Sequence, residues 1–190
     1  MRISAEAPQV DIRVIAADDP LAMTLLDQDV ADLAIAPFEK VEPQFERQQL
    51  MEPGDFLCVM RQGHPLSSKP LTLEAFALTP QLLVSRTGDP CGFVDEILAQ
   101  FALERRVAFT VPSFLLAPIV LMQTDLIATL PRRLAEMCQD MGLTICEPPF
   151  PQRKFPLAML WHRRLSKDPG HTWVRNTLAE VAATIFKSSQ

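Results

Sequence analysis

Short apolar runs rich in β-branched residues alternate with helix-like patterns along most of this 190-residue chain. This alternation is typical of α/β proteins with largely parallel strands, because their helices pack on the faces of a central sheet. It disfavours a helical bundle and a β-sandwich. The chain has 48% hydrophobic and 22% charged residues, as a folded globular protein has, and its length suits one large domain or two small lobes.

The expected elements follow from the apolar runs and from the Pro, Gly and capping residues that bound them. Strands are expected at residues 10–16, 31–37, 45–51, 56–61, 81–85, 106–111, 126–131, 143–151 and 155–162. Helices are expected at residues 20–29, 71–78, 92–103, 132–141 and 169–186, with a further one after residue 114.

The first residues do not look like the start of an ordinary α/β domain. The segment AEAPQVDIRVIAADDP reads as the last turn of a helix, a stop at Pro8 and a strand from Val10 to Ala16. The chain is therefore expected to begin within a domain. A sheet that lacks a strand exposes backbone donors and acceptors along its edge, and another chain would be able to cover them.

Two stretches are candidates for the connections between two lobes, one at residues 78–81 and one at residues 147–155. The second is rich in proline, which fixes φ and removes a backbone donor, so that it makes a stiff connection rather than part of a sheet. We expect lobe I to comprise residues 1–80 and 156–190, and lobe II to comprise residues 81–155.

The formal net charge of −5 argues against nucleic-acid binding by this chain alone, because such binding needs a basic face. The four cysteines show no CxxC pair and no zinc-ligand spacing, so that no metal or cofactor is expected. The first ten residues lack the apolar stretch of a secretory signal, and no apolar run is long enough to span a membrane. Free thiols without a targeting segment fit the cytoplasm.

The segment VSRTGDPCGFVDEIL, residues 84–98, places two glycines four positions apart between a strand and a helix. A helix N-terminus attracts anions, but the loop matches neither GxxxxGK[ST] nor GxGxxG, so that a nucleotide site lacks its usual parts. A small carboxylate or a neutral polar ligand remains open, as does a tight turn without a ligand. Cys91 is a candidate nucleophile because a helix N-terminus lowers the pKa of a thiol, although no histidine is close in sequence.

Ser113 and Phe114 combine a hydroxyl and an aromatic ring at a strand-to-helix junction, where open α/β sheets bind ligands. A plain N-cap serine would look the same. His64 lies in a His-Pro turn. His162 follows Trp161 at a strand end, where it could face a cleft, but a structural, hydrogen-bonded role is favoured for it.

Six segments taken together resemble the effector-binding domain of LysR-type transcriptional regulators, in the branch of the nodulation and aromatic-catabolism regulators. They are DLAIAPF (32–38), RQGHPL (61–66), QLLVS with the glycine loop and VDEIL (81–98), VPSF (111–114), DLIATLPRRLA (125–135) and WHRRLSKDPGHTWVR (161–175). Each motif is weak alone, but their order and spacing over nearly the whole chain make the match specific.

The resemblance implies two Rossmann-like α/β lobes joined by two crossing strands, as in type 2 periplasmic binding proteins, with a small-molecule effector between the lobes. It implies a homodimer or homotetramer that reaches DNA only through a helix-turn-helix domain, which this chain does not contain. It also implies that lobe I lacks its first strand and most of its first helix. Catalysis is not part of this function.

The effector-contacting positions of the family fall on seven residues of this chain. They are Gln81, Ser85, Thr87, Gly88, Ser113, Phe114 and Leu160, the last beside Trp161. In the aromatic-responsive branch the positions of Gln81 and Ser113 can hold histidines, so that this chain is not expected to sense the same ligands. Interlobe pockets are mostly apolar with a few orienting polar groups, which suits a small aromatic or carboxylic acid.

Two other functions stay open on the sequence. One is a solute-binding or enzymatic α/β protein that uses the same cleft, for which loss of activity on alkylation of Cys91 would be diagnostic. The other is a truncated module that dimerises with an intact regulator, which the missing edge strand favours.

Overall fold

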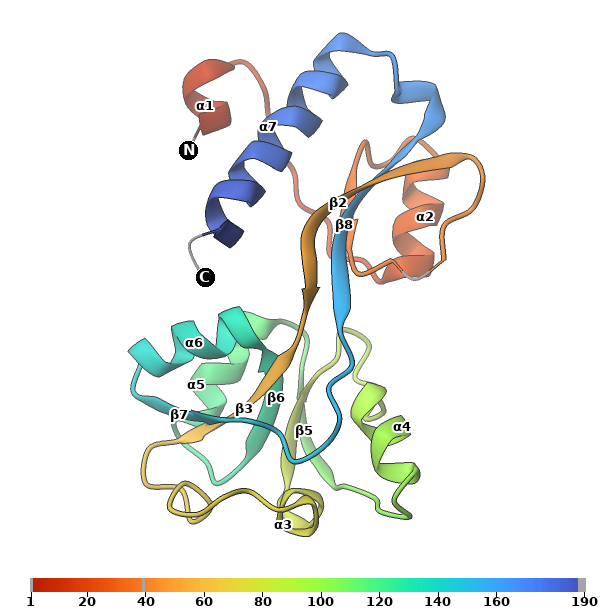
Figure 1. Cartoon of the computed structure of the whole chain (residues 1–190). Helices are drawn as coiled ribbons and strands as arrows, with labels where there is room; N and C mark the ends of the chain where they lie inside the picture. The colour runs from red at the N-terminus through yellow and green to blue at the C-terminus, as the bar shows by residue number, and fades with distance from the viewer. Residues whose placement is uncertain (1, 39, 188–190) are drawn as a thin grey trace. The chain divides into compact units, whose positions relative to one another are not determined.

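The computed structural model describes residues 2–38 and 40–187, which divide into two compact units (Figure 1). Unit 1 comprises residues 1–54 and 155–190, and unit 2 comprises residues 55–154. The chain thus leaves unit 1 at a first crossing, between Gly54 and Asp55, and returns at a second crossing, between Lys154 and Phe155. Two such crossings are what the resemblance implied.

Unit 1 is built on a three-stranded antiparallel sheet in the order β1-β8-β2. The central strand β8 (Phe155–His162) lies between β1 (Ala34–Ala36) and β2 (Phe45–Gly54), and Figure 1 shows β2 and β8 side by side. Leu160 of β8 is fully buried in the core of this unit together with Leu26 and Phe38. The other elements of unit 1 are α1 (Arg2–Glu6), α2 (Asp19–Asp27), η2 (Arg163–Leu165) and α7 (Pro169–Lys187).

Unit 2 is built on a five-stranded mixed sheet in the order β5-β4-β6-β3-β7. Its strands are β3 (Phe56–Arg61), β4 (Gln81–Val84), β5 (Val107–Val111), β6 (Ile127–Pro131) and β7 (Leu143–Cys146). Strand β4 runs parallel to β5 and β6, whereas β3 runs antiparallel to β6 and β7. Its helices are α3 (Leu73–Leu78), α4 (Phe93–Ala99), η1 (Phe114–Leu116), α5 (Ala117–Leu121) and α6 (Arg132–Asp140).

The sheet of unit 2 is covered on both faces. Successive side chains of a strand point to opposite faces, and in β3 they enter two separate cores. Leu57 and Val59 belong to one buried cluster, whereas Cys58 and Met60 belong to the other. A strand buried on both faces reads as a continuous apolar run, which is why FLCVMR was recognisable as a strand.

The α/β fold class and most of the expected elements are confirmed, with ends that differ by a few residues. The helix expected at 92–103 ends at Ala99, and Ala102 beyond it adopts the left-handed conformation at φ 54°. The strand expected at 143–151 ends at Cys146.

The strand expected at residues 10–16 is wrong. These residues form no strand, and within the described part of the chain no backbone N–H group of residues 11–17 donates to a backbone carbonyl. The apolar side chains of Val10, Ile12 and Val14 are 45%, 53% and 92% exposed. The apolar pattern has strand propensity, but a strand also needs a paired neighbour.

The expected division of the chain at residues 80 and 81 is corrected to Gly54 and Asp55. Strand β3 pairs with β6 and β7, and Phe76 of α3 is fully buried in a core of unit 2. These contacts assign residues 55–80 to the second unit rather than to the first. The second crossing lies within the expected stretch at residues 147–155.

Arg132, the first residue of α6, binds chain segments next to both crossings. Its Nε and Nη2 atoms donate to the two carboxylate oxygens of Asp55 at 2.7 and 2.8 Å, and Nη2 also donates to Glu147 Oε1 at 2.9 Å. The Arg132 backbone N–H donates to the Asp55 carbonyl at 2.9 Å. The hydrogen bonds from Arg132 hold the pKa of the Asp55 carboxyl group below its usual value.

A buried ion pair ties the start of α4 to the start of β4. The guanidinium of Arg105 donates to Asp95 at 2.9 and 2.7 Å, and to Gln81 Oε1 at 2.9 Å. The side chain of Arg105 is only 1% exposed. Gln81 Nε2 donates in turn to the Phe76 carbonyl at 3.0 Å. Burial would by itself raise the pKa of Asp95, but the bonds from Arg105 lower it below the usual value.

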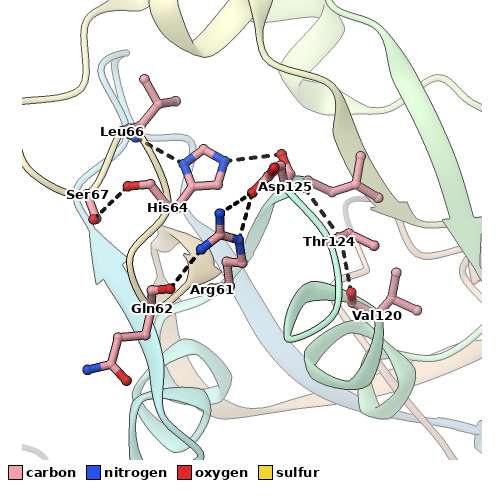
Figure 2. A network of polar contacts seen from close by, with 9 residues as sticks. Arg61, Gln62, His64, Leu66, Ser67, Val120, Thr124 and Asp125 are labelled. Carbon is pink, nitrogen blue, oxygen red and sulfur yellow. Dashed lines mark hydrogen bonds and ion pairs between the residues drawn. The ribbon is translucent and has the colours of Figure 1, made fainter.

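A second polar network closes the loop after β3 (Figure 2). His64 is 4% exposed, its Nδ1 accepts from the Leu66 N–H at 3.1 Å, and its Nε2 lies 3.1 Å from the Asp125 carbonyl. Since Nδ1 accepts, Nε2 carries the proton and donates. Arg61 Nε donates to Asp125 Oδ1 at 2.6 Å in the same network. His64 therefore has a structural role in this loop.

Of the helices in the described residues, none has the length and apolar character that crossing a membrane requires.

Replacing His64 by alanine is expected to lower the free energy of unfolding by about 2 kcal/mol, because the Leu66 N–H and the Asp125 carbonyl lose their buried partner. His64→Asn is the matched control: its side-chain oxygen stands where Nδ1 accepts, so that it should restore part of the loss. Urea unfolding of the three proteins measures the difference. Equal stability of His64→Ala and the unchanged chain would contradict the structural role.

Replacing Asp95 by asparagine is expected to lower the free energy of unfolding by about 3 kcal/mol near pH 7, because Arg105 then keeps its charge in a buried place without a counter-charge. Because the folded-state pKa of Asp95 is depressed, its contribution is full above the unfolded pKa and is lost as the pH falls through the folded value. The gap between the two proteins should therefore close below about pH 4.

The control for this experiment is Asp125→Asn, which removes the ion pair with Arg61 while the Asp125 side chain is 68% exposed. Exposed pairs contribute little, so that this change should cost less than about 1 kcal/mol. A pH-independent gap for Asp95→Asn would show that its carboxylate does not act through charge.

Candidate functional site

Two loops meet at the carboxyl ends of the parallel strands β4 and β5. The Ser85 N–H donates to the Val111 carbonyl at 2.8 Å, which places the start of the loop at residues 85–92 beside the end of β5. The chain after β4 leads to β5 on one side, and the chain after β6 leads to β7 on the other. Adjacent parallel strands with diverging connections mark the edge where open α/β sheets bind ligands.

The first loop carries the hydroxyl groups of Ser85 and Thr87 and an exposed glycine, Gly88. Ser85 is half-buried, and Thr87 and Gly88 are exposed. Gly88 has φ +82°, a conformation that favours glycine, and its N–H donates to the Ser85 carbonyl at 3.4 Å. No atom lies within 4 Å of the place where a Cβ of Gly88 would stand. Glycine is therefore required here by the positive φ of the turn, and not because neighbouring atoms leave no room for a side chain.

The second loop carries Ser113 and an apolar surface. Ser113 Oγ accepts from the Leu115 N–H at 3.3 Å and caps η1, so that the N-cap interpretation is confirmed. Phe114 is 42% exposed and Leu115 is 73% exposed. Ile119, in the helix that follows, is 54% exposed. Contiguous exposed apolar side chains often mark an interaction or ligand site.

Five of the seven expected effector residues thus lie in the two loops at this edge: Ser85, Thr87, Gly88, Ser113 and Phe114. Gln81 begins β4 and so lies at the opposite end of that strand, fully buried and bonded to Arg105 and Phe76. Leu160 is fully buried in the core of unit 1. Direct effector contact by these two residues stays a prediction from the family resemblance.

The loop is poorly suited to a phosphate. Asp95 and Glu96 occupy the first turn of α4, and the Gly92 N–H already donates to Asp95 Oδ2 at 2.7 Å. These two carboxylates repel a doubly charged phosphate at the start of α4 itself. The positive end of α4 is therefore already neutralised by the chain itself.

Cys91 is also poorly suited to act as a nucleophile. The negative charge of Asp89, followed by the smaller effects of burial and Asp95, raises the pKa of its thiol. A nucleophilic cysteine needs the opposite shift, because the thiolate is the reactive form. Cys91 is exposed, and its backbone N–H donates to Asp89 Oδ1 at 2.9 Å, which makes it a turn residue.

Two surface hollows lie elsewhere, and neither includes an expected effector residue. One, of about 500 Å³, is lined by Ala99, Ala102, Leu103 and Glu104. The other, of about 310 Å³, is lined by Pro20, Met23, Thr24, Asp27, Glu42, Gln44 and Phe45. Within residues 2–38 and 40–187, no three His, Cys, Asp or Glu side chains are grouped as metal ligands would be.

Sequence reasoning missed Arg105, which holds the first loop in place through Asp95 and Gly92. Its partner Asp95 is ten positions away across a turn, and no short-range pattern indicates that distance.

Residues 1–183 match the family described as the LysR substrate binding domain. The transcriptional activator NahR of Pseudomonas putida is 28% identical over 180 residues, which are 94% of this chain and 60% of NahR. The regulator SyrM 1 of Sinorhizobium fredii is 32% identical over 186 residues, 97% of this chain and 54% of SyrM 1. Nodulation protein D 1 of Neorhizobium galegae is 32% identical over 196 residues, covering 100% of this chain and 61% of that relative.

Solved structures agree with these relatives. The regulatory domain of MexT, a transcriptional activator in Pseudomonas aeruginosa, has a TM-score of 0.80 at 30% identity, over 94% of this chain and 86% of that one. The effector binding domain of QuiR in complex with shikimate has a TM-score of 0.71 at 14% identity, over 97% of this chain and 88% of that one, and shows the fold alone.

The expected resemblance and the two-lobed fold class are thereby confirmed. The chain spans somewhat more than half the length of the three curated relatives. The relatives are regulators of transcription, and the family is not one of enzymes. The chain belongs to the LysR substrate binding domain family, the effector-binding domain of LysR-type transcriptional regulators.

Proposed function

We propose that this chain binds a small aromatic or carboxylic acid through the loops that follow β4 and β5, and that binding controls transcription. The observation that carries the proposal is the bond from the Ser85 N–H to the Val111 carbonyl, 2.8 Å long, because it joins the two loops at the ligand edge of the sheet. The placement of the effector between the two lobes remains the expectation from the family.

The chemistry of the two loops supports this class of ligand. The hydroxyl groups of Ser85 and Thr87 are able to donate to a carboxylate or to accept from a ring hydroxyl. Phe114 offers an exposed ring face to an aromatic or alicyclic ligand. An apolar surface with a few polar groups is the usual composition of a small-molecule site.

Regulation would follow from a shift between two arrangements of the protein, one of which binds the effector more tightly. DNA contact would belong to a helix-turn-helix domain outside this chain, because the net charge of −5 does not suit a nucleic-acid surface. A cytoplasmic location accompanies the proposal, since all four cysteines are free thiols.

A panel of aromatic and aliphatic carboxylic acids, tested by thermal shift, is expected to contain a compound that raises the Tm of the chain in a saturable way. Phe114→Ala should weaken binding of that compound about tenfold, which corresponds to about 1.4 kcal/mol. Leu78→Ala is the matched control, because Leu78 is an apolar side chain that is 84% exposed on α3. A Tm that stays flat across the panel, or equal loss in both variants, would contradict the proposed site.

A second candidate function is dimerisation through the unpaired segment at residues 10–14. It has no strand partner among the described residues, and its apolar side chains are exposed. The sequence Val-Asp-Ile-Arg-Val is self-complementary when two copies run antiparallel about Ile12. Val10 then stands opposite Val14 of the second copy, and Asp11 stands opposite Arg13.

Opposite charges and β-branched residues at facing positions stabilise antiparallel strand pairs. The arrangement has a twofold axis, so that each copy supplies the same patch and the contact closes as a dimer. We propose that a second copy of this chain, rather than a different protein, pairs with this segment. A tetramer would need a further contact.

Sedimentation of the chain is expected to show a monomer–dimer equilibrium that Arg13→Asp weakens by about tenfold, because two pairs of like charges then face each other. Exchanging the charges in Asp11→Arg/Arg13→Asp should restore the dimer, since the facing signs are opposite again. A monomer at all concentrations, or a charge exchange that fails to restore pairing, would exclude this contact.

A further inference from the structure

Two free cysteines of unit 2 face each other across neighbouring strands. Cys58 of β3 and Cys146 of β7 are register partners in an antiparallel pair. Directly opposite residues on such strands have Cα atoms about 4.5 to 5.5 Å apart, within the range of about 4.4 to 6.8 Å found in disulfides. Both side chains belong to the same core, because Cys146 packs against the buried cluster that contains Cys58. No backbone rearrangement is needed to bring the two sulfur atoms together.

The two cysteines differ in their access to solvent. Cys58 is fully buried among the apolar side chains of one core, close to Met60 and Phe76. Cys146 ends the edge strand of the sheet and is only partly buried. A small oxidant therefore reaches Cys146 first, and Cys58 lies behind it.

The pKa values of the two thiols also differ, with the more accessible Cys146 having the lower one. The hydrogen bond from the Cys58 thiol lowers the pKa of Cys146 despite the opposing effects of burial and of Glu147. The same contact, with burial, raises the pKa of Cys58. On the other side of Cys58, Thr129 of β6 is its register partner. Among the described residues, the buried hydroxyl oxygen of Thr129 has no hydrogen-bond partner. That hydroxyl is free to donate to the Cys58 sulfur.

We propose that Cys58 and Cys146 form a redox pair that a hydroperoxide oxidises to a disulfide across β3 and β7. In the first step the Cys146 thiolate attacks a peroxide oxygen, an S–O bond forms, the O–O bond breaks, and the departing hydroxide takes up a proton as water. In the second step the Cys58 sulfur attacks the sulfenic acid of Cys146, the S–S bond forms, and the S–O bond breaks. The Cys58 proton leaves with the hydroxide as a second water, so that one H₂O₂ is reduced for each disulfide.

The position of the pair gives the bond a structural consequence. Cys58 follows the first crossing closely along the chain, and Cys146 directly precedes the proline-rich segment that leads to the second crossing. The disulfide would link the two segments of unit 2 through which the chain arrives and departs. A covalent link over so long a loop also restricts the unfolded chain and raises stability.

The other two cysteines provide internal controls. Cys91 is exposed, but the charge of Asp89 raises the pKa of its thiol. Cys138 is buried, and burial raises the pKa of its thiol. In the double variant Cys91→Ser/Cys138→Ser, any thiol chemistry must come from the proposed pair.

The test treats this reduced double variant with H₂O₂ and counts free thiols under denaturing conditions. The expected count falls from two to none per chain, the intact mass falls by two hydrogens, and a non-reducing digest contains the linked Cys58 and Cys146 peptides. The urea midpoint should rise on oxidation and return with dithiothreitol. Two thiols that remain after treatment, or a link that forms only between two chains, would overturn the proposal.

Single variants made in the same background separate the two roles. Cys58→Ser should leave a Cys146 sulfenic acid that dimedone traps, because the second sulfur is missing. Cys146→Ser should give no trapped sulfenic acid, because Cys58 is buried and protonated. Trapping at Cys58 and not at Cys146 would contradict the assigned order. If either single variant fails to fold, the mass and the digest of the double variant still decide between disulfide and dithiol.

Discussion

The buried pairing of Arg105 with Asp95 is the interaction on which the arrangement of the candidate site depends. One guanidinium reaches α4 through Asp95 and β4 through Gln81. Asp95 in turn accepts from the Gly92 N–H, where the glycine loop ends. The loop that offers Ser85, Thr87 and Gly88 is therefore anchored at its far end by a charge pair whose guanidinium is buried. At its other end the loop is joined to β5 by the bond from the Ser85 N–H to the Val111 carbonyl.

Element type could be predicted from the sequence wherever the local pattern and the tertiary environment agree. FLCVMR is a strand by propensity and is buried on both faces, and the helix expected at residues 71–78 forms as α3 with Thr72 as its N-cap. Residues 10–16 have equal propensity but no neighbour with which to pair, so that the same reasoning failed there. The division between the units was misplaced because a single residue, Asp55, separates β2 from β3, and so short a connection carries no linker composition.

The candidate site was only partly predictable. Ser113 and Phe114 follow a strand and precede a helix, so that their place at the carboxyl edge of the sheet could be inferred from order alone. Gln81 was assigned to the ligand by family resemblance, and its bonds to Arg105 and to the Phe76 carbonyl could not be inferred, because they join residues that only the folded chain brings together. The same holds for Cys58 and Cys146, because they lie far apart in the sequence and only the register of β3 with β7 brings them together.

The bonds from Arg132 to Asp55 and Glu147 leave different lengths of unbound chain at the two connections between the units. At the first crossing, the residue that Arg132 binds is Asp55, which directly precedes β3, so that no further residue lies between the bound residue and the strand. On the returning side residues 148–154 lie between the anchored glutamate and β8. The return segment is therefore the longer of the two connections, and its prolines permit few conformations. What conformational freedom the connection between the units has therefore lies on the returning side.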